Sequence, residues 1–133
     1  MNNTFAVYCG PMFSAKTTSL LSSIDRFKYQ GKKVAVFKPR LDDRYDEDFV
    51  CTHSGWKVPA KCIKNGTDIL EYLSELNDQP QVIAVDEAFM VPNIAKVLIW
   101  LYRSGYSIVV SSLDLSAMCK PFPEIEKMLP WAT

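Results

Sequence analysis

The stretch CGPMFSAKTTSLL, residues 9–21, nearly matches a phosphate-binding loop. Such loops follow the pattern G-x-x-x-x-G-K-[ST], directly after a buried strand and at the start of a helix. Gly10, Lys16 and Thr17 fit this pattern, whereas Ala15 stands where the second glycine is expected. The apolar run FAVYC precedes the loop and a helical pattern follows it, so the context also agrees.

The chemistry of this stretch suits a nucleotide phosphate. Backbone N–H groups at the turn, together with the helix N-terminus, would form an anion-binding cradle. Lys16 would bring a positive charge to the terminal phosphates, and Thr17 would offer a hydroxyl to Mg²⁺. Ala15 costs on the order of 1 kcal/mol if its backbone needs a positive φ, and otherwise mainly crowds the phosphate. The alternative interpretation is a capped helix start with a solvated lysine.

Four short apolar runs predict strands, at residues 5–9, 33–38, 82–86 and 107–113. Their apolar cores are continuous, which is typical of strands covered on both faces of a parallel sheet. Helical patterns lie between them: from Thr17 to just before Gly31, after a cap at Thr67 or Asp68, and over roughly 93–104. We therefore expect one α/β domain over residues 1–133. It should be P-loop NTPase-like (RecA-like), with a mostly parallel sheet and helices on both faces.

Composition excludes several classes of function. Fifteen basic residues balance fifteen acidic ones, which gives no sign of a nucleic-acid partner. No stretch reaches the roughly 20 apolar residues that span a bilayer, and the N-terminus has no secretory signal, so we expect a cytoplasmic protein without a membrane partner. The four cysteines are widely spaced without a C-x-x-C pair, which favours buried thiols over a metal knuckle or disulfides.

A second candidate site lies in VIAVDEAFM, where an acidic pair follows an apolar strand. Nucleoside triphosphatases place a carboxylate near their metal in this way. In a parallel sheet this end lies on the same edge as the phosphate loop. Asp86 would then act on Mg²⁺ directly or through water, and Glu87 would be a general base. The alternative is an acidic pair that caps the following helix.

Two further segments leave alternatives open. Residues 39–60 are charged and too long for a simple connection, which favours a functional loop, with a short hairpin around FVCTH. The lone His53 in this segment is more typical of a surface residue than of a ligand. The stretch VLIWLY in the third helix is apolar nearly all round. It indicates either deep burial or a subunit interface.

Four segments together resemble the thymidine kinase family shared by the eukaryotic cytosol, bacteria, poxviruses and large phages. They are GPMFSAKTTSLL, KPRLDDRYDEDFVCTH, VIAVDEAFM and SLDLSAMCKPF, in the family's order. The resemblance implies transfer of the γ-phosphate of ATP to the 5′-hydroxyl of thymidine or deoxyuridine, with Mg²⁺. It also implies a homo-oligomer, either a dimer or a tetramer.

The resemblance assigns roles by position. Glu87 would be the catalytic base and Lys16 would act on the transferred phosphate. The Mg²⁺ ligands would be Thr17, Asp42 and Asp86. The nucleoside pocket would include Met12, Phe89 and Leu113, and the residues around ATP would be Gly10, Pro11, Met12, Phe13, Ser14, Ala15, Lys16, Thr17 and Thr18.

The chain departs from the family pattern at Ala15, at Phe89 in place of glutamine, and at Ala117 in place of an aromatic residue. The family's C-terminal lasso, which carries zinc on C-x-x-C pairs, would lie outside this chain, so zinc is expected only there. Two alternatives therefore stay open. One is an impaired or inactive kinase-derived module that binds a nucleotide or a protein, and the other is an unrelated ATPase of the same fold.

Overall fold

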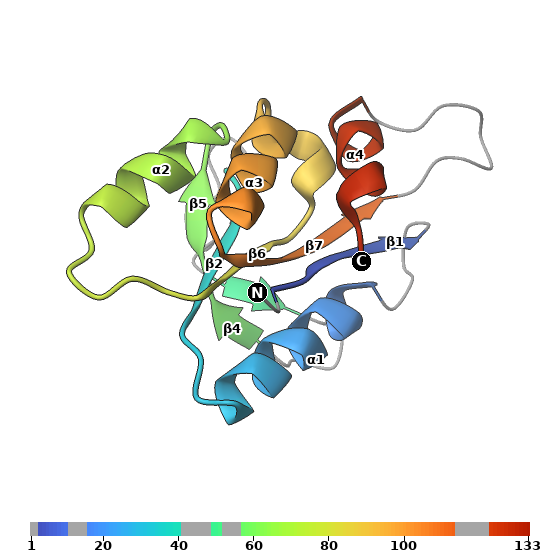
Figure 1. Cartoon of the computed structure of the whole chain (residues 1–133). Helices are drawn as coiled ribbons and strands as arrows, with labels where there is room; N and C mark the ends of the chain where they lie inside the picture. Colours follow the sequence, from blue (N-terminus) through green and yellow to red (C-terminus); the bar gives the residue numbers. More distant parts are fainter. Residues whose placement is uncertain (1–2, 11–15, 41–48, 52–56, 114–122) are drawn as a thin grey trace.

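The elements of the chain alternate between strands and helices (Figure 1). The structure is a computed structural model that describes residues 3–10, 16–40, 49–51, 57–113 and 123–133. Its strands are β1 Phe5–Gly10, β2 Val34–Pro39, β3 Phe49–Cys51, β4 Lys57–Pro59, β5 Lys61–Ile63, β6 Val82–Val85 and β7 Ser107–Leu113. Its helices are α1 Lys16–Tyr29, α2 Thr67–Ser74, α3 Ile94–Arg103 and α4 Pro123–Met128, with short 3-10 turns η1 Ala88–Met90 and η3 Leu129–Trp131.

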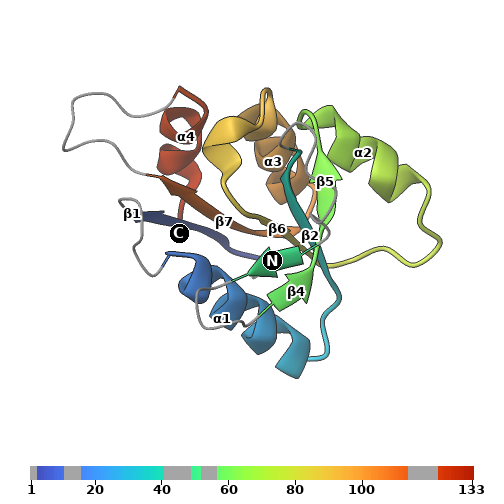
Figure 2. The ribbon, with the colours of Figure 1, turned by 180° about the vertical axis from the view of Figure 1, so that it is seen from behind.

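Five strands form one parallel sheet in the order β1-β7-β6-β2-β5. All four predicted strands are present, and the α/β prediction with helices on both faces is confirmed (Figures 1 and 2). The sequence did not predict β5, which pairs with β2 only over Lys61–Ile63. Because every strand runs the same way, the carboxyl ends of β1, β7, β6 and β2 share one edge.

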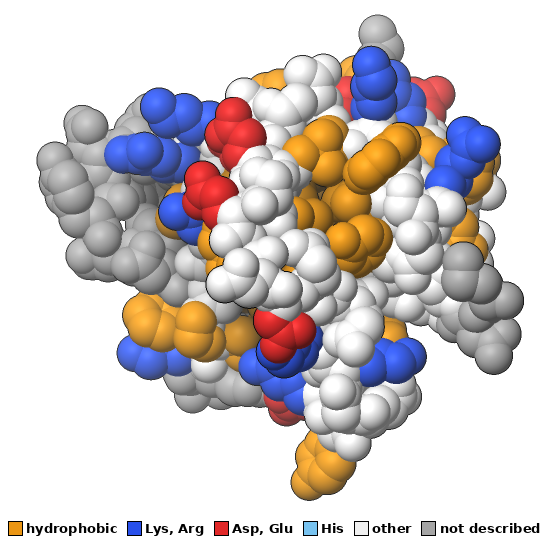
Figure 3. Space-filling view, turned by 60° about the vertical axis from the view of Figure 1, so that its left-hand side comes forward, with side chains coloured by type: hydrophobic (Ala, Val, Ile, Leu, Met, Phe, Trp, Pro, Cys, Tyr) orange, Lys and Arg blue, Asp and Glu red, His pale blue; other side chains and the backbone are white. Residues whose placement is uncertain are grey.

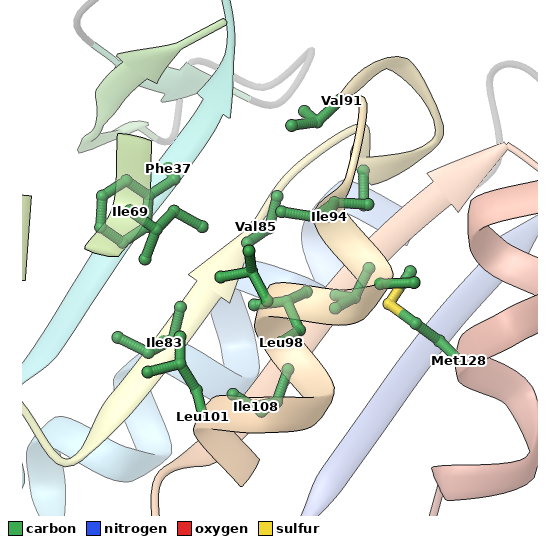
Figure 4. Packing of buried hydrophobic residues seen from close by; sticks show 14 of the residues in the cluster. Phe37, Ile69, Ile83, Val85, Val91, Ile94, Leu98, Leu101, Ile108 and Met128 are labelled. Carbon is green, nitrogen blue, oxygen red and sulfur yellow. The ribbon is translucent and has the colours of Figure 1, made fainter. Parts of the chain in front are cut away.

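The face of the sheet covered by α2, α3 and α4 carries the larger apolar core (Figure 4). From β6, Ile83 and Val85 are fully buried there, and Leu98 of α3 packs over them. Met128 of α4 reaches the same core from the other side of α3. We call this side the α3 face. Together with burial on the opposite face, the burial of this face explains why these strands are continuous apolar runs.

The opposite face of the sheet is covered by α1 and by the β3–β4 hairpin, and we call it the α1 face (Figure 2). The alternate residues of β6, Val82 and Ala84, are buried on this side. Leu20, Leu21 and Ile24 of α1 pack on them, as do Val50 of β3 and Val58 of β4. The antiparallel pairing of β3 with β4 confirms the hairpin expected around FVCTH.

The start of α2 differs from the sequence prediction. Its N-cap is Gly66, not Thr67 or Asp68. The Asp68 carboxylate instead accepts hydrogen bonds from the backbone N–H groups of Lys64 and Asn65, at 2.7 and 3.2 Å. Gly66 is required by packing, since a Cβ there would lie 2.6 Å from the backbone oxygen of Asn93. Tertiary contact between the starts of α2 and α3 therefore decides the cap.

Two other expectations have mixed outcomes. In VLIWLY, Val97, Leu98 and Leu101 are buried as deep burial requires, but Trp100 is 59% exposed. Cys9 is exposed, so the expectation of buried thiols is wrong at that position. Cys62 is half-buried.

No helix in the described part of the chain is both long enough and apolar enough to cross a membrane.

Candidate functional site

The site begins where β1 ends. Gly10 is the last residue of β1 and pairs with Leu113, the last residue of β7. Helix α1 begins at Lys16, with Thr17 half-buried and Thr18 exposed in its first turn. The predicted loop residues 11–15 lie outside the described residues. The first N–H groups of α1 lack partners within the helix, as is general at helix starts, and they occur at the same sheet edge.

Asp86 directly follows β6 and its side chain lies on the α1 face. Its backbone N–H still donates to the oxygen of Phe37 in β2 at 2.9 Å, so strand pairing continues to this residue. Side chains alternate along a strand, and Asp86 has the same parity as Val82 and Ala84. Asp86 is only 8% exposed. The structure thus places a buried carboxylate on the face that α1 covers.

Ser111 of β7 connects the two acidic residues. Its hydroxyl donates a hydrogen bond to Oδ1 of Asp86. The backbone N–H of Glu87 donates to the same Ser111 oxygen at 3.4 Å. Glu87 has φ 51° and ψ 44°, a left-handed conformation that residues other than glycine adopt infrequently. Backbone strain of this kind concentrates at functional sites.

Lys38 is a third buried polar residue on the α1 face, and sequence reasoning missed it. Phe37 pairs with Val85, so the next residues along the two strands are Lys38 and Asp86. Lys38 is 8% exposed, and its Nζ donates to the backbone oxygen of Phe49 in β3 at 2.7 Å. The available signal was a lysine at the end of an otherwise apolar strand. For Ser111 it was a serine pair at the end of SIVVSSL.

The structure brings together only part of the predicted site. Asp86 and Glu87 meet through Ser111 at the carboxyl edge. Phe89 is half-buried against the core of the α3 face, so it packs toward the other layer from Asp86. Leu113 ends β7. Asp42 and the predicted residues Pro11, Met12, Phe13, Ser14 and Ala15 lie outside the described residues.

The residues at this edge fit a Mg²⁺ ion held with a nucleotide. Mg²⁺ is usually bound by one or two carboxylates, water and substrate phosphates rather than by a cage of protein ligands. Asp86 supplies one buried carboxylate with an oxygen already oriented by Ser111. In the described part of the chain, no three His, Cys, Asp or Glu side chains cluster as metal ligands.

A separate hollow of about 340 Å³ lies between β5 and α2, at the opposite end of the strand order from β1. It is lined by both signs of charge. Figure 3 shows that basic and acidic side chains lie next to one another on this side of the molecule. The charged residues that line the hollow are Arg40, Lys61, Lys64, Asp68, Glu71 and Glu75. Because charges of both signs line it, this hollow does not select an anion as a helix start does.

Two kinds of comparison relate this chain to known proteins. A family model described as thymidine kinase matches residues 3–133. The structure is similar to the genome packaging NTPase B204 from Sulfolobus turreted icosahedral virus 2 in complex with ATP-gammaS, with 16% identity and a TM-score of 0.53. The match covers 96% of this chain and 72% of that one.

A second structure of the same packaging NTPase, in complex with sulfate, matches with 15% identity and a TM-score of 0.51. It covers 94% of this chain and 70% of that chain. At such low identity these two likenesses speak for the fold alone. They agree with the α/β architecture, with its mostly parallel sheet, predicted from the strand and helix order.

Proposed function

The chain belongs to the thymidine kinase family, and we propose that it transfers the γ-phosphate of ATP to the 5′-hydroxyl of thymidine or deoxyuridine. The family supports a kinase that binds a nucleotide; the acceptor and the residue roles are the proposal. We further propose that the chain works as a homo-oligomer in the cytoplasm.

One observation carries the proposal: a buried carboxylate and a second acidic residue directly follow β6, at the sheet edge where β1 ends and α1 begins. Asp86 faces the layer of α1, and Glu87 follows in a left-handed conformation held at Ser111. This arrangement supports a division of roles between the two acids. Asp86 would hold Mg²⁺, and Glu87 would lie close to the acceptor hydroxyl.

The proposed reaction transfers one proton and one phosphoryl group. Glu87 takes the proton from the 5′-hydroxyl as the oxygen attacks the γ-phosphorus, so a new P–O bond forms. The bond from the γ-phosphorus to the oxygen bridging to the β-phosphate breaks, and ADP leaves. Lys16 and the N–H groups at the start of α1 would stabilise negative charge on the phosphates. Mg²⁺, with Thr17, Asp42 and Asp86 around it, would neutralise charge on the phosphate oxygens when bound.

A phosphoryl-transfer assay tests the proposal. The purified chain is incubated with γ-labelled ATP, Mg²⁺ and thymidine or deoxyuridine, and both the nucleoside monophosphate and ADP are measured. We expect monophosphate formation that requires Mg²⁺ and equals ADP release. ATP binding without nucleoside-dependent turnover would contradict the proposal. ADP release that is independent of the nucleoside would instead indicate an ATPase.

A second candidate function is a kinase-derived module that binds nucleotide or protein without turnover. Ala15 favours it, because a methyl group replaces the loop glycine where the backbone approaches phosphate. Ala15→Gly discriminates between the two explanations of weak binding. If this change restores tight ATP binding and turnover, the loop explains the weakness. If neither ATP binding nor turnover is measurable in either chain, a protein-binding role is favoured.

A further inference from the structure

We infer that Ser111 is a positioning residue, whose hydroxyl holds the Asp86 carboxylate and the Glu87 backbone in one arrangement. The inference rests on the proposed function, because it concerns how the two acids are presented to Mg·ATP and the acceptor. Ser111 lies in β7, the strand between β1 and β6 in the sheet. It therefore lies in the strand between β1 and the strand that the acidic pair follows.

The geometry uses both capacities of one hydroxyl group. Ser111 is fully buried, and its hydroxyl hydrogen is donated to Oδ1 of Asp86. Its oxygen accepts from the backbone N–H of Glu87 at 3.4 Å. A serine hydroxyl has one hydrogen to donate and two lone pairs that accept, so the two bonds are compatible. No other residue type of this size makes both interactions with comparable strength.

The two bonds act on different properties of the site. The bond to Asp86 selects the orientation of a carboxylate that is only 8% exposed. The bond to Glu87 restrains a backbone with φ 51°, which persists only when surrounding groups hold it. Alanine at position 111 removes both restraints at once. The predicted result is a less ordered Mg²⁺ ligand and a less ordered turn at Glu87.

The structure supplies a matched control in the same strand. Ser107 is also buried, and its hydroxyl accepts from the backbone N–H of Thr4 at 3.1 Å. It lies at the amino end of β7, whereas Ser111 lies near the carboxyl end. Ser107→Ala therefore removes a buried hydroxyl and a hydrogen bond from β7 without touching the acidic pair. Any general cost to the sheet is shared by both variants.

The test measures ATP affinity over a series of Mg²⁺ concentrations, together with thymidine turnover, on the full chain. For Ser111→Ala we expect the Mg²⁺ concentration at half-maximal ATP binding to rise about tenfold, equal to about 1.4 kcal/mol. We expect kcat to fall while KM for thymidine changes less than threefold. Ser111→Thr keeps the hydroxyl and should return the Mg²⁺ midpoint to within about threefold of wild type. Ser107→Ala should match wild type in both readouts.

A second measurement needs neither nucleotide nor turnover. Hydrogen exchange of the Glu87 amide in the nucleotide-free chain should accelerate in Ser111→Ala and stay unchanged in Ser107→Ala. Equal Mg²⁺ midpoints and equal Glu87 exchange in the two alanine variants would overturn the inference. If Ser111→Ala unfolds, Ser111→Cys keeps a similar size with a weak donor, and the same shifts are expected at smaller amplitude. A wild-type chain without thymidine turnover but with these shifts would overturn the proposed function and support the role of Ser111.

Discussion

The two faces of the sheet differ in what they bury near the carboxyl edge. On the α3 face, three helices cover a broad apolar core that includes Phe37, Ile83 and Leu98. On the α1 face, one helix and a hairpin cover a smaller core. The α1 face also buries the polar side chains of Lys38 and Asp86. One layer therefore mainly stabilises the domain, while the other buries the polar groups of the candidate site.

The strongest test of this comparison is Glu87→Gln, which removes the proposed base and keeps the side-chain size. We expect kcat to fall by about 10²- to 10⁴-fold, because a positioned general base contributes that much. Thermal stability should change little, since Glu87 is only half-buried. Steady-state kinetics and a melting curve measure the two effects. Glu126→Gln, an exposed carboxylate change on α4, is the control, and equal activity of the two variants would contradict the role of Glu87.

Leu98→Ala on the α3 face should instead lower stability and leave ATP binding nearly unchanged. Leu98 is fully buried beneath α3, so its truncation should lower the free energy of unfolding by about 2–5 kcal/mol. Under conditions where the variant is folded, ATP affinity should stay within about threefold of wild type. Denaturant unfolding and ATP titration provide these numbers. A loss below about 1 kcal/mol would mean that the α3 face is not the main stabilising layer.

Lys38→Met tests how the hairpin is attached to the α1 face. The change keeps the length of the side chain but removes the hydrogen bond to the backbone oxygen of Phe49. We expect a loss of about 1–2 kcal/mol, because a part-buried backbone acceptor loses its charged donor. Hydrogen exchange at Val50 and Val58 should accelerate. The exposed Lys61→Met is the control, and identical stability and exchange in both would show that the Lys38 bond does not hold the hairpin.

The smallest expected effect concerns the start of α3. Oε1 of Glu124 in α4 accepts from the backbone N–H of Ala95 at 2.9 Å, and so supplies a cap from another helix. Glu124→Gln keeps an acceptor but removes the negative charge near the helix start. Stability should fall by about 0.3–1 kcal/mol, and Glu124→Ala should cost more. Denaturant midpoints measure both changes. If Gln and Ala are equally costly, the charge and not the hydrogen bond is the important part.

Sequence reasoning predicted the main strands, the hairpin and the acidic pair because each has a strong local signal. The run VIAVDE shows both the burial of β6 and the acids at its end. The strand β5 was missed, since three residues are too few for a recognisable pattern. Helix α4 was missed for the same reason, with only Ile125 and Met128 buried in six residues. The cap of α2 was wrong, because a contact with Asn93 decides it.

Local sequence patterns were enough to predict the α/β order, the phosphate-loop pattern at residues 10–17 and the position of Asp86 and Glu87 at a strand end. These features depend on neighbouring residues, which the chain order contains. Only the tertiary structure decided that Ser111, 25 residues from Asp86, donates to its carboxylate, and that Lys38 is buried on the same face. Such partners depend on strand order and register. A single chain pattern does not carry that information, because β7 and β2 meet β6 only after the sheet has formed.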